Sequence, residues 1–279
     1  MGSRPSLVKP HEVPPKRRFG QHFLKDTAVA DRILACLRPL PGDSFLEIGA
    51  GTGALSRRLA ARVSDLVALE VDRDCLEPLR QALAPFPSAR VVHADILQAD
   101  LRELVSPYVE SGRRLRVAGN LPYNIATAII ERLLGSRLPF KDFGFLVQLE
   151  VAQRITAHPG TRAYGYFSVL CQHSAEVRMG LTVSPGSFRP PPKVTSAVVS
   201  LVPRARASQD RCELALQLVA KAAFSHRRKT IANSLAHAPG LEVRPERLLA
   251  DARVDPGRRA EELSVAEYER LARSYLRLA

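Results

Sequence analysis

The stretch Ser44-Phe45-Leu46-Glu47-Ile48-Gly49-Ala50-Gly51-Thr52-Gly53 decides the fold of this chain. Its first five residues have the apolar content of a buried strand, and glycines follow at three alternate positions. Beyond the glycines, Leu55, Leu59 and Val63 keep the spacing of an amphipathic helix. A strand, a glycine loop and a helix in this order predict one unit of an α/β domain.

Four further apolar runs predict strands that alternate with helical segments. They cover residues 66–71, 90–96, 115–118 and 143–149. This alternation is typical of a doubly wound parallel sheet. Such sheets place their sites at the carboxyl ends of the strands, and Glu70, Asp95 and Asn120 all fall there. Turns that shared no common site would not be expected to place polar residues at the ends of three strands.

The composition divides the chain into three parts. Residues 1–16 are rich in proline and lack apolar periodicity, so we expect a disordered basic tail. An α/β domain is expected over residues 17–204, with strand-like runs at 176–183 and 196–202 that are compatible with an antiparallel hairpin at one edge of the sheet. Beyond a polar linker only helical patterns occur, and they cover residues 212–224, 228–235, 245–252 and 265–278. We therefore expect a small all-helical domain over residues 205–279.

The charge of the chain favours a polyanionic partner such as nucleic acid, because 41 Lys and Arg outweigh 28 Asp and Glu to give a net charge of +13. No apolar run reaches the roughly 18 residues of a membrane span. The cysteines lack the spacing of a zinc site or a disulfide framework. They are Cys36, Cys75, Cys171 and Cys212. We therefore predict a cytoplasmic protein with reduced thiols, no metal and no membrane association.

The stretch Gly119-Asn120-Leu121-Pro122-Tyr123-Asn124 suits alkylation of an amino group on a flat ring. The side-chain oxygen of Asn120 and the carbonyl of Leu121 can both accept hydrogen bonds from one exocyclic amine and direct its lone pair at an electrophile. Pro122 stiffens the backbone, and Tyr123 offers a ring on which a base can stack. An ordinary turn between a strand and a helix is the alternative interpretation.

The glycine loop admits two cofactors. Gly49-x-Gly51-x-x-Ala54, with Glu70 about 20 residues on, satisfies the dinucleotide fingerprint, so an NAD-dependent oxidoreductase is a competing hypothesis. Glu47, just before the loop, would repel a pyrophosphate but would suit the ammonium group of S-adenosylmethionine. On that interpretation Glu70 accepts hydrogen bonds from the ribose and Asp95 accepts one from the adenine amine. Each carboxylate could instead be a solvated charge at a strand end.

Six motifs together resemble the KsgA/RsmA family of ribosomal RNA adenine dimethyltransferases. They are Phe19-Gly20-Gln21-His22-Phe23-Leu24, Leu46-Glu47-Ile48-Gly49-Ala50-Gly51-Thr52-Gly53, Asn120-Leu121-Pro122-Tyr123-Asn124-Ile125, Phe188-Arg189-Pro190-Pro191-Pro192-Lys193-Val194, Phe224-Ser225-His226-Arg227-Arg228-Lys229-Thr230 and Arg259-Ala260-Glu261-Glu262-Leu263. The resemblance implies a Rossmann-like class I methyltransferase sheet of seven strands with a small all-helical C-terminal domain. It also implies dimethylation of two adjacent adenosines near the 3′ end of 16S rRNA, in the assembling small ribosomal subunit, by a monomer that uses S-adenosylmethionine.

The resemblance also implies a set of site residues. Catalysis falls to Asn120, Leu121, Pro122 and Tyr123. Cofactor contacts fall to His22, Leu24, Gly49, Glu70, Asp95 and Asn120, with His22 standing where the family often has Asn. The interpretation of the glycine loop adds Glu47 and Gly51 to the predicted cofactor contacts.

RNA contacts are expected from basic clusters. These are Arg227, Arg228 and Lys229, with Lys16, Arg17 and Arg18. For the further group Arg113, Arg114 and Arg116 a solvated surface is favoured. Two alternatives stay open: an Erm-like enzyme that dimethylates one adenosine of 23S rRNA, and an RNA-binding assembly factor with a vestigial methyltransferase site.

Overall fold

The computed structural model of the chain describes residues 13–204, 210–226 and 228–279. The tail expected over residues 1–16 therefore lies outside the described residues, except for residues 13–16, and so does Arg227. Contacts divide the chain into two compact units. The first takes the chain up to Gln148 together with Gly180–Ser200, and the second takes Leu149–Met179 together with Leu201–Ala279. The domain boundary expected between residues 204 and 205 stays a prediction, and the compact units differ from it in grouping Leu149–Met179 with the C-terminal helices.

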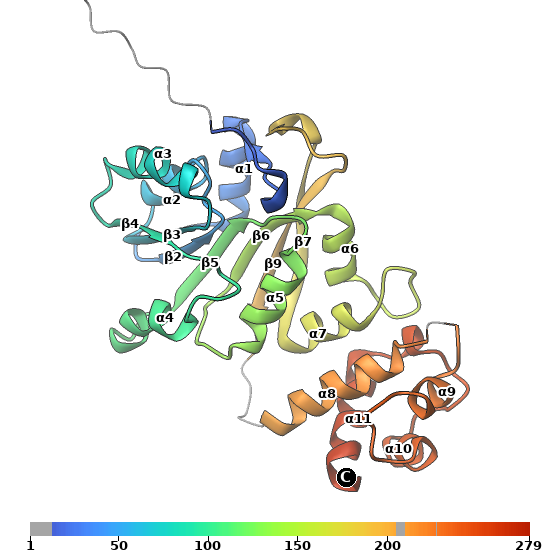
Figure 1. Ribbon diagram of the computed structural model, residues 1–279. Helices are drawn as coiled ribbons and strands as arrows, with labels where there is room; N and C mark the ends of the chain where they lie inside the picture. Colours follow the sequence, from blue (N-terminus) through green and yellow to red (C-terminus); the bar gives the residue numbers. More distant parts are fainter. Residues whose placement is uncertain (1–12, 205–209, 227) are drawn as a thin grey trace, which may run out of the picture. The chain divides into compact units, whose positions relative to one another are not determined.

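The described part of the chain contains one seven-stranded sheet in the order β4-β3-β2-β5-β6-β9-β7 (Figure 1). Its strands are β2 (Ser44–Ile48), β3 (Asp65–Glu70), β4 (Ala89–His93), β5 (Leu115–Asn120), β6 (Phe143–Gln148), β7 (Ala175–Val183) and β9 (Ser196–Pro203). Strands β4, β3, β2, β5 and β6 pair in parallel, which confirms the predicted doubly wound arrangement. The last two predicted strands, β7 and β9, neighbour each other at one edge.

Helices connect the strands of the first unit. They are α1 (Thr27–Leu37), α2 (Ser56–Ala60), α3 (Arg73–Leu83), α4 (Leu101–Glu110) and α5 (Ala126–Gly135). Carboxylates cap the starts of α1, α3 and α4: Asp26 accepts a hydrogen bond from the backbone N–H of Val29 at 3.1 Å, and Asp72 and Asp100 cap α3 and α4 in the same way. Figure 1 shows α1, α2 and α3 on one side of the sheet and α4 and α5 on the other.

Alternation along the strands explains how the sheet is covered on both faces. Phe45, Leu66, Ala68 and Leu146 belong to the buried cluster that includes the apolar side chains of α1, α2 and α3. Their strand neighbours, such as Leu46, point to the opposite face and are also buried. Strands buried on both faces become continuous apolar runs in the sequence, which is why these strands were predictable.

A short two-stranded sheet brings the N-terminal motif to the first unit. β1 (Phe23–Leu24) pairs antiparallel with β8 (Phe188–Arg189), which follows the 3₁₀ helix Pro185–Ser187. Another 3₁₀ helix, Arg17–Phe19, precedes β1. The pairing joins two of the sequence motifs although more than 160 positions separate them.

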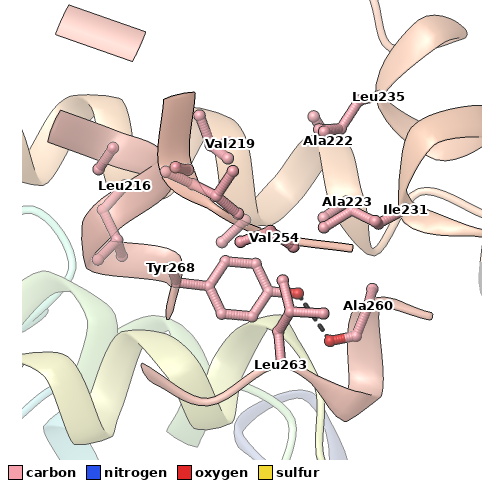
Figure 2. Packing of buried hydrophobic residues seen from close by; sticks show 14 of the residues in the cluster. Leu216, Val219, Ala222, Ala223, Ile231, Leu235, Val254, Ala260, Leu263 and Tyr268 are labelled. Carbon is pink, nitrogen blue, oxygen red and sulfur yellow. Dashed lines mark hydrogen bonds between the residues drawn. The ribbon is translucent and has the colours of Figure 1, made fainter. Parts of the chain in front are cut away.

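Helices dominate the second unit. They are α6 (Leu149–Thr156), α7 (Tyr166–Ser174), α8 (Asp210–Ala223), α9 (Ile231–Ala236), α10 (Pro245–Ala252) and α11 (Val265–Leu278). Figure 2 shows their core, in which Leu216 and Val219 of α8 and Ile231 of α9 gather around Tyr268 of α11. The Tyr268 ring is fully buried, and its hydroxyl donates a hydrogen bond to the carbonyl of Ala260 at 2.8 Å. A buried hydroxyl with a partner adds packing area without the cost of an unsatisfied polar group.

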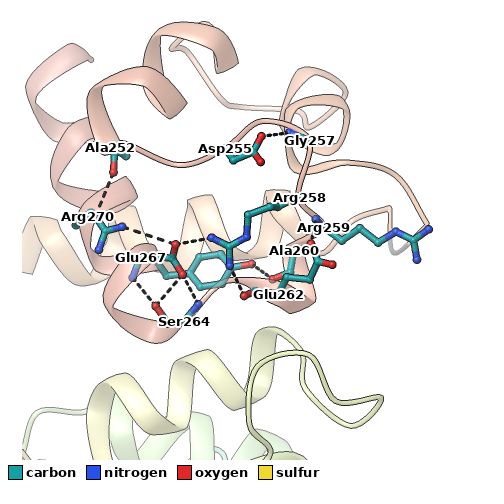
Figure 3. A network of polar contacts seen from close by, with 11 residues as sticks. Ala252, Asp255, Gly257, Arg258, Arg259, Ala260, Glu262, Ser264, Glu267 and Arg270 are labelled. Carbon is teal, nitrogen blue, oxygen red and sulfur yellow. Dashed lines mark hydrogen bonds and ion pairs between the residues drawn. The ribbon is translucent and has the colours of Figure 1, made fainter.

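Polar contacts hold the start of α11 against the 3₁₀ helix Ala260–Glu262 (Figure 3). One oxygen of Glu267 pairs with Arg258 at 2.6 Å, and the other accepts hydrogen bonds from the backbone N–H and hydroxyl of Ser264. Burial alone would raise the pKa of Glu267, but these partners more than offset it and lower the pKa. Ser264, directly after the motif Arg259–Leu263, thus caps α11 in a capping box with Glu267.

Arg116 is buried, so a role in RNA contact is excluded for it. Its guanidinium pairs with Asp43 at 2.6 Å and with Asp142 at 2.8 Å, and donates to the carbonyl of Leu37 at the end of α1. It therefore ties α1 to β5 and to the turn before β2, at the end of the sheet away from the glycine loop.

Candidate active site

The glycine loop packs directly on the end of β5. Gly49 has a φ of +69°, and a Cβ there would lie 3.5 Å from the carbonyl oxygen of Asn120. A Cβ on Gly119 would lie only 2.4 Å from the carbonyl oxygen of Ile48, so the two main chains touch. This approach requires glycine and places the loop beside the Asn-Leu-Pro-Tyr turn.

Glu70, at the end of β3, is held rigidly under the loop. One carboxylate oxygen accepts the backbone N–H of Gly51 at 2.7 Å, and the other accepts those of Val71 and Asp72 at 2.9 and 2.8 Å. Burial raises the pKa of Glu70 even though these three N–H groups favour its charged form. Two carboxylate oxygens offer about four acceptor positions, so about one remains for a ribose hydroxyl.

Glu47 is a buried carboxyl group that forms no ion pair with a described residue. Its side chain is 2% exposed, and its Oε2 atom has no hydrogen-bond partner among the described residues. Burial, together with the nearby charge of Glu70, raises the pKa of Glu47 to about 8. Glu47 lines a cavity, and Gly49, Gly51, Leu24 and Asn120 also line it. A buried acceptor of this kind fits the ammonium group of a ligand.

Asn120 presents an unused acceptor at the same cavity. Its Nδ2 atom donates to the backbone carbonyl of His22 at 2.9 Å, which fixes the orientation of the amide. Its Oδ1 atom is buried and has no hydrogen-bond partner among the described residues. An acceptor held in this way fits the amino group of a purine base.

The rest of the catalytic turn is rigid. The backbone N–H of Leu121 donates to Leu146 at 3.0 Å, and that of Ile125 donates to the carbonyl of Pro122 at 3.1 Å. The hydroxyl of Tyr123 shares a hydrogen bond of 2.5 Å with that of Ser196. The Tyr123 ring, expected to stack on a base, stacks here on the imidazole of His22, with centroids 5.1 Å apart.

The N-terminal motif supplies one wall of the site. His22 donates from Nδ1 to the carbonyl of Pro190 at 2.8 Å, while its own carbonyl accepts from Asn120. Phe23 and Leu24 line the cavity, and the Phe23 ring lies against Gly51. The backbone and the ring of His22 therefore contact the Asn-Leu-Pro-Tyr turn, and His22 does not line the cavity.

Glu70, Asp95 and His22 lie outside the residues that line this cavity. Asp95 follows β4, is half-buried, and accepts the backbone N–H of Leu97 at 2.9 Å. The sequence interpretation missed the apolar lining from Ile33, Leu55 and Leu146, since apolar residues carry no chemical signal. It also missed Ser196, the partner of Tyr123.

The predicted RNA-contact residues differ in their surroundings. Arg228 and Lys229 are exposed in the turn between α8 and α9, and Arg18 lies over the Phe19 ring at 4.7 Å. Lys16 is paired with Asp72 and Asp74. Arg227 and the side chain of Arg17 lie outside what the structure describes. Arg113, for which a solvated position was favoured, lies over the Tyr108 ring.

No group of three or more His, Cys, Asp or Glu among the described residues could hold a metal ion. None of the described helices is long and apolar enough to cross a membrane.

A parallel sheet with a glycine loop after β2, an acidic residue at the end of β3 and an Asn-Leu-Pro-Tyr turn at the end of β5 is the arrangement expected of a class I methyltransferase. A sequence profile described as "Ribosomal RNA adenine dimethylase" matches residues 14–276. The chain therefore belongs to the ribosomal RNA adenine dimethylase family, whose members are S-adenosylmethionine-dependent enzymes.

Named relatives cover nearly the whole chain. "Ribosomal RNA small subunit methyltransferase A" of Geobacter metallireducens is 42% identical over 268 residues, which cover 94% of this chain and 96% of the relative. The protein of the same name from Xanthomonas campestris is 42% identical and is covered to 95%.

Solved structures share the fold. The 23S rRNA methyltransferase ErmE is 25% identical with a TM-score of 0.69, over 90% of this chain and 98% of ErmE. A dimethyladenosine transferase from Plasmodium falciparum has a TM-score of 0.73 at 22% identity, over 90% of this chain and 96% of the other. These likenesses confirm the predicted class I methyltransferase fold.

Proposed function

We propose that this chain dimethylates the N6 amines of two adjacent adenosines in the 3′-terminal hairpin of 16S rRNA, with S-adenosylmethionine as methyl donor, during assembly of the small ribosomal subunit. The observation that carries the proposal is a cavity lined by two buried acceptors, Oδ1 of Asn120 and Oε2 of Glu47, neither of which has a hydrogen-bond partner among the residues that the structure describes. One atom fits the target amine, and the other fits the ammonium of the donor.

The residues of the cavity fit this donor better than a dinucleotide. Glu47 faces the space beside the glycine loop, where the pyrophosphate of NAD would meet a carboxylate. An ammonium group there would instead satisfy an acceptor that has no other partner. Glu70 has acceptor capacity left for a ribose hydroxyl, and we assign Asp95 to the adenine amine.

The chain's own contribution to the chemistry is orientation. The donor supplies a methyl group already activated on a sulfonium, so no covalent nucleophile is required. Asn120 Oδ1 and the carbonyl of Leu121 would hold the N6 amine and withdraw its lone pair from the ring, while Pro122 keeps the turn rigid. The adenine must leave its stack to reach this turn, where Tyr123 is the aromatic partner.

The small-subunit substrate rests on the relatives rather than on the site. Relatives at 42% identity are named small-subunit methyltransferases, whereas ErmE, at 25% identity, is named for 23S rRNA. RNA contact is assigned to Arg227, Arg228 and Lys229, with Arg17 and Arg18, and such clusters recognise folded RNA through its backbone. Action on an assembling subunit would place the protein, as a monomer, in the bacterial cytoplasm.

The test is to incubate the protein with labelled S-adenosylmethionine and, separately, with unmethylated small-subunit particles and with 23S rRNA, and to map the product by mass spectrometry. We expect two neighbouring dimethyladenosines in the 3′-terminal hairpin of 16S rRNA. A single modified adenosine in 23S rRNA would overturn the substrate assignment. Binding without turnover on either RNA would instead favour an assembly factor.

A further inference from the structure

The ammonium group of Lys16 lies between two carboxylates at the start of α3, the N-cap Asp72 and Asp74 in the first turn of the helix. It contacts Asp72 at 2.5 Å and Asp74 at 2.6 Å. The Asp72 side chain is 1% exposed and that of Lys16 is 25% exposed, so their ion pair is partly buried, whereas the Asp74 side chain is 54% exposed. A lysine engaged in this way is not available as a free cation for an RNA phosphate.

Gln21 completes the same cluster. Its side-chain oxygen accepts the backbone N–H of Lys16 at 2.7 Å, and its amide nitrogen donates to the second oxygen of Asp72 at 2.8 Å. Asp72 therefore accepts from Lys16 through one oxygen and from Gln21 through the other. Burial would raise the pKa of Asp72, but these contacts outweigh it and lower the pKa.

The segment fastened by this cluster, residues 16–24, is called here the N-terminal strap. Gly20 in the strap lies against Asn124, where a Cβ would come within 2.8 Å of the amide oxygen. Farther along, the carbonyl of His22 accepts from Asn120, and Phe23 lies against Gly51. The strap thus runs from Asp72 to the amine acceptor and the glycine loop.

Asp72 also connects the strap to the other side of the site. Its backbone N–H donates to Glu70 at 2.8 Å, so the residue that anchors the strap also orients the carboxylate assigned to the ribose. The charged groups here are Lys16, Glu70, Asp72 and Asp74, and Lys16 is the cation that the described contacts place against both aspartates. Without it, a buried carboxylate would lose its counter-charge beside Glu70.

We propose that Lys16 and Gln21 are positioning residues of the methyltransferase site, which act through Asp72 to hold the strap against Asn120 and the glycine loop. The inference rests on the proposed function, because it assigns the strap to the donor and amine sites. It gives Lys16 a different role from the RNA contact that its place in a basic cluster indicated.

The experiment compares Lys16→Met with Lys25→Met, which removes an exposed lysine just beyond the strap. Calorimetry measures the Kd for S-adenosylmethionine, single-turnover assays with saturating donor measure methyl transfer, and binding to small-subunit particles is followed against salt. We expect Lys16→Met to raise the Kd about tenfold and to slow methyl transfer, as suits loss of one charge-assisted contact. The salt slope of RNA binding should stay that of the wild type, and Lys25→Met should match the wild type in the Kd and in methyl transfer.

Two further variants separate positioning from a general loss of stability. Gln21→Ala keeps the ion pair but removes the hydrogen bonds from Gln21 to Asp72 and to the Lys16 backbone, so it should also raise the Kd. Lys16→Arg keeps the charge and should recover most of the affinity. In a double-mutant cycle, Lys16→Met and Asp74→Asn should be less than additive, because they remove the same contact.

The outcomes distinguish this inference from the proposed function. If the wild type does not bind S-adenosylmethionine, the proposed function fails and the inference fails with it. If the wild type binds but Lys16→Met and Gln21→Ala bind equally well, only the inference is overturned. An unchanged Kd with a shallower salt slope for Lys16→Met would return Lys16 to the RNA interface.

Discussion

The side-chain amide of Asn120 donates to the main-chain carbonyl of His22 at 2.9 Å, and this bond orients the whole amide. An asparagine amide has one oxygen and one nitrogen, so holding the nitrogen on His22 leaves the oxygen directed elsewhere. That oxygen is buried and has no hydrogen-bond partner in the described part of the chain. The N-terminal segment therefore fixes the direction in which this acceptor points.

Replacing Asn120 by alanine should reduce turnover by about 10²- to 10³-fold, the size typical of losing one oriented polar group that acts in the transition state. The Kd for S-adenosylmethionine should change much less. Single-turnover methylation at saturating donor, with calorimetry of donor binding, measures both quantities. Near-normal turnover would show that Asn120 does not hold the amine.

Replacing Glu70 by alanine should weaken donor binding before it affects the chemical step. A hydrogen bond to a charged group contributes about 1.5–3 kcal/mol, so the Kd should rise at least about tenfold. Glu77→Ala, on the exposed surface of α3, is the control for loss of a carboxylate nearby. If Glu70→Ala bound the donor with unchanged affinity, the ribose contact would be wrong.

Replacing Glu47 by glutamine should stabilise the protein without donor at alkaline pH. Burial raises the pKa of Glu47 from 4.5 to about 8, so between these values the folded state binds more protons than the unfolded state. Stability is therefore lost as pH rises through this window, by about 1.4 kcal/mol per pH unit for this group. Gln does not titrate, so the Tm advantage of the variant should be larger at pH 8 than at pH 5.5.

The same carboxyl should release a proton when an ammonium ligand binds. At pH 6.5, calorimetry in buffers of different ionisation enthalpy should show about one proton released by the wild type and about none by Glu47→Gln. The variant should also bind S-adenosylmethionine more weakly. Equal proton release in both proteins would mean that another group faces the ammonium.

Replacing Arg227, Arg228 and Lys229 together by alanine should weaken binding to small-subunit particles and flatten its salt dependence. Each lost phosphate contact should reduce the slope by about one. Donor affinity should hardly change. The control variant removes three exposed arginines of the first unit, Arg32, Arg80 and Arg102, which have no assigned role. Equal slopes for the two triple variants would make the cluster an ordinary solvated surface.

The sequence predicted most strands because each is an apolar run that ends at a polar residue. β2 was predicted to the residue, and so were α10 and α11. β4 was predicted too long, because Asp95 caps the following turn at Leu97 instead of continuing the strand. The helix expected from residue 228 begins at Ile231, where Thr230 supplies the cap.

The candidate site was predictable only where chemistry and strand ends coincide. Glu47, Glu70 and Asn120 stand at or next to the ends of β2, β3 and β5, where a polar residue after an apolar run indicates a site. Lys16 was assigned to RNA because its neighbours are basic, whereas its partners Asp72 and Asp74 lie more than 50 positions away. The pairing of β1 with β8 could not be predicted for the same reason, because a contact between two short segments far apart in the chain produces no periodic pattern in the sequence.

The backbones of Gly119 and Ile48 lie so close together that even the smallest side chain at position 119 does not fit. A single methyl group on Gly119 would fall 2.4 Å from a carbonyl oxygen that belongs to the neighbouring strand. In a saturation library, position 119 should therefore be restricted to glycine by a screen for folded protein alone. Position 120 should pass that screen with several residues and become restricted to asparagine only when methylation is selected. Two adjacent positions would thus be restricted for different reasons, position 119 by backbone packing and position 120 by the reaction.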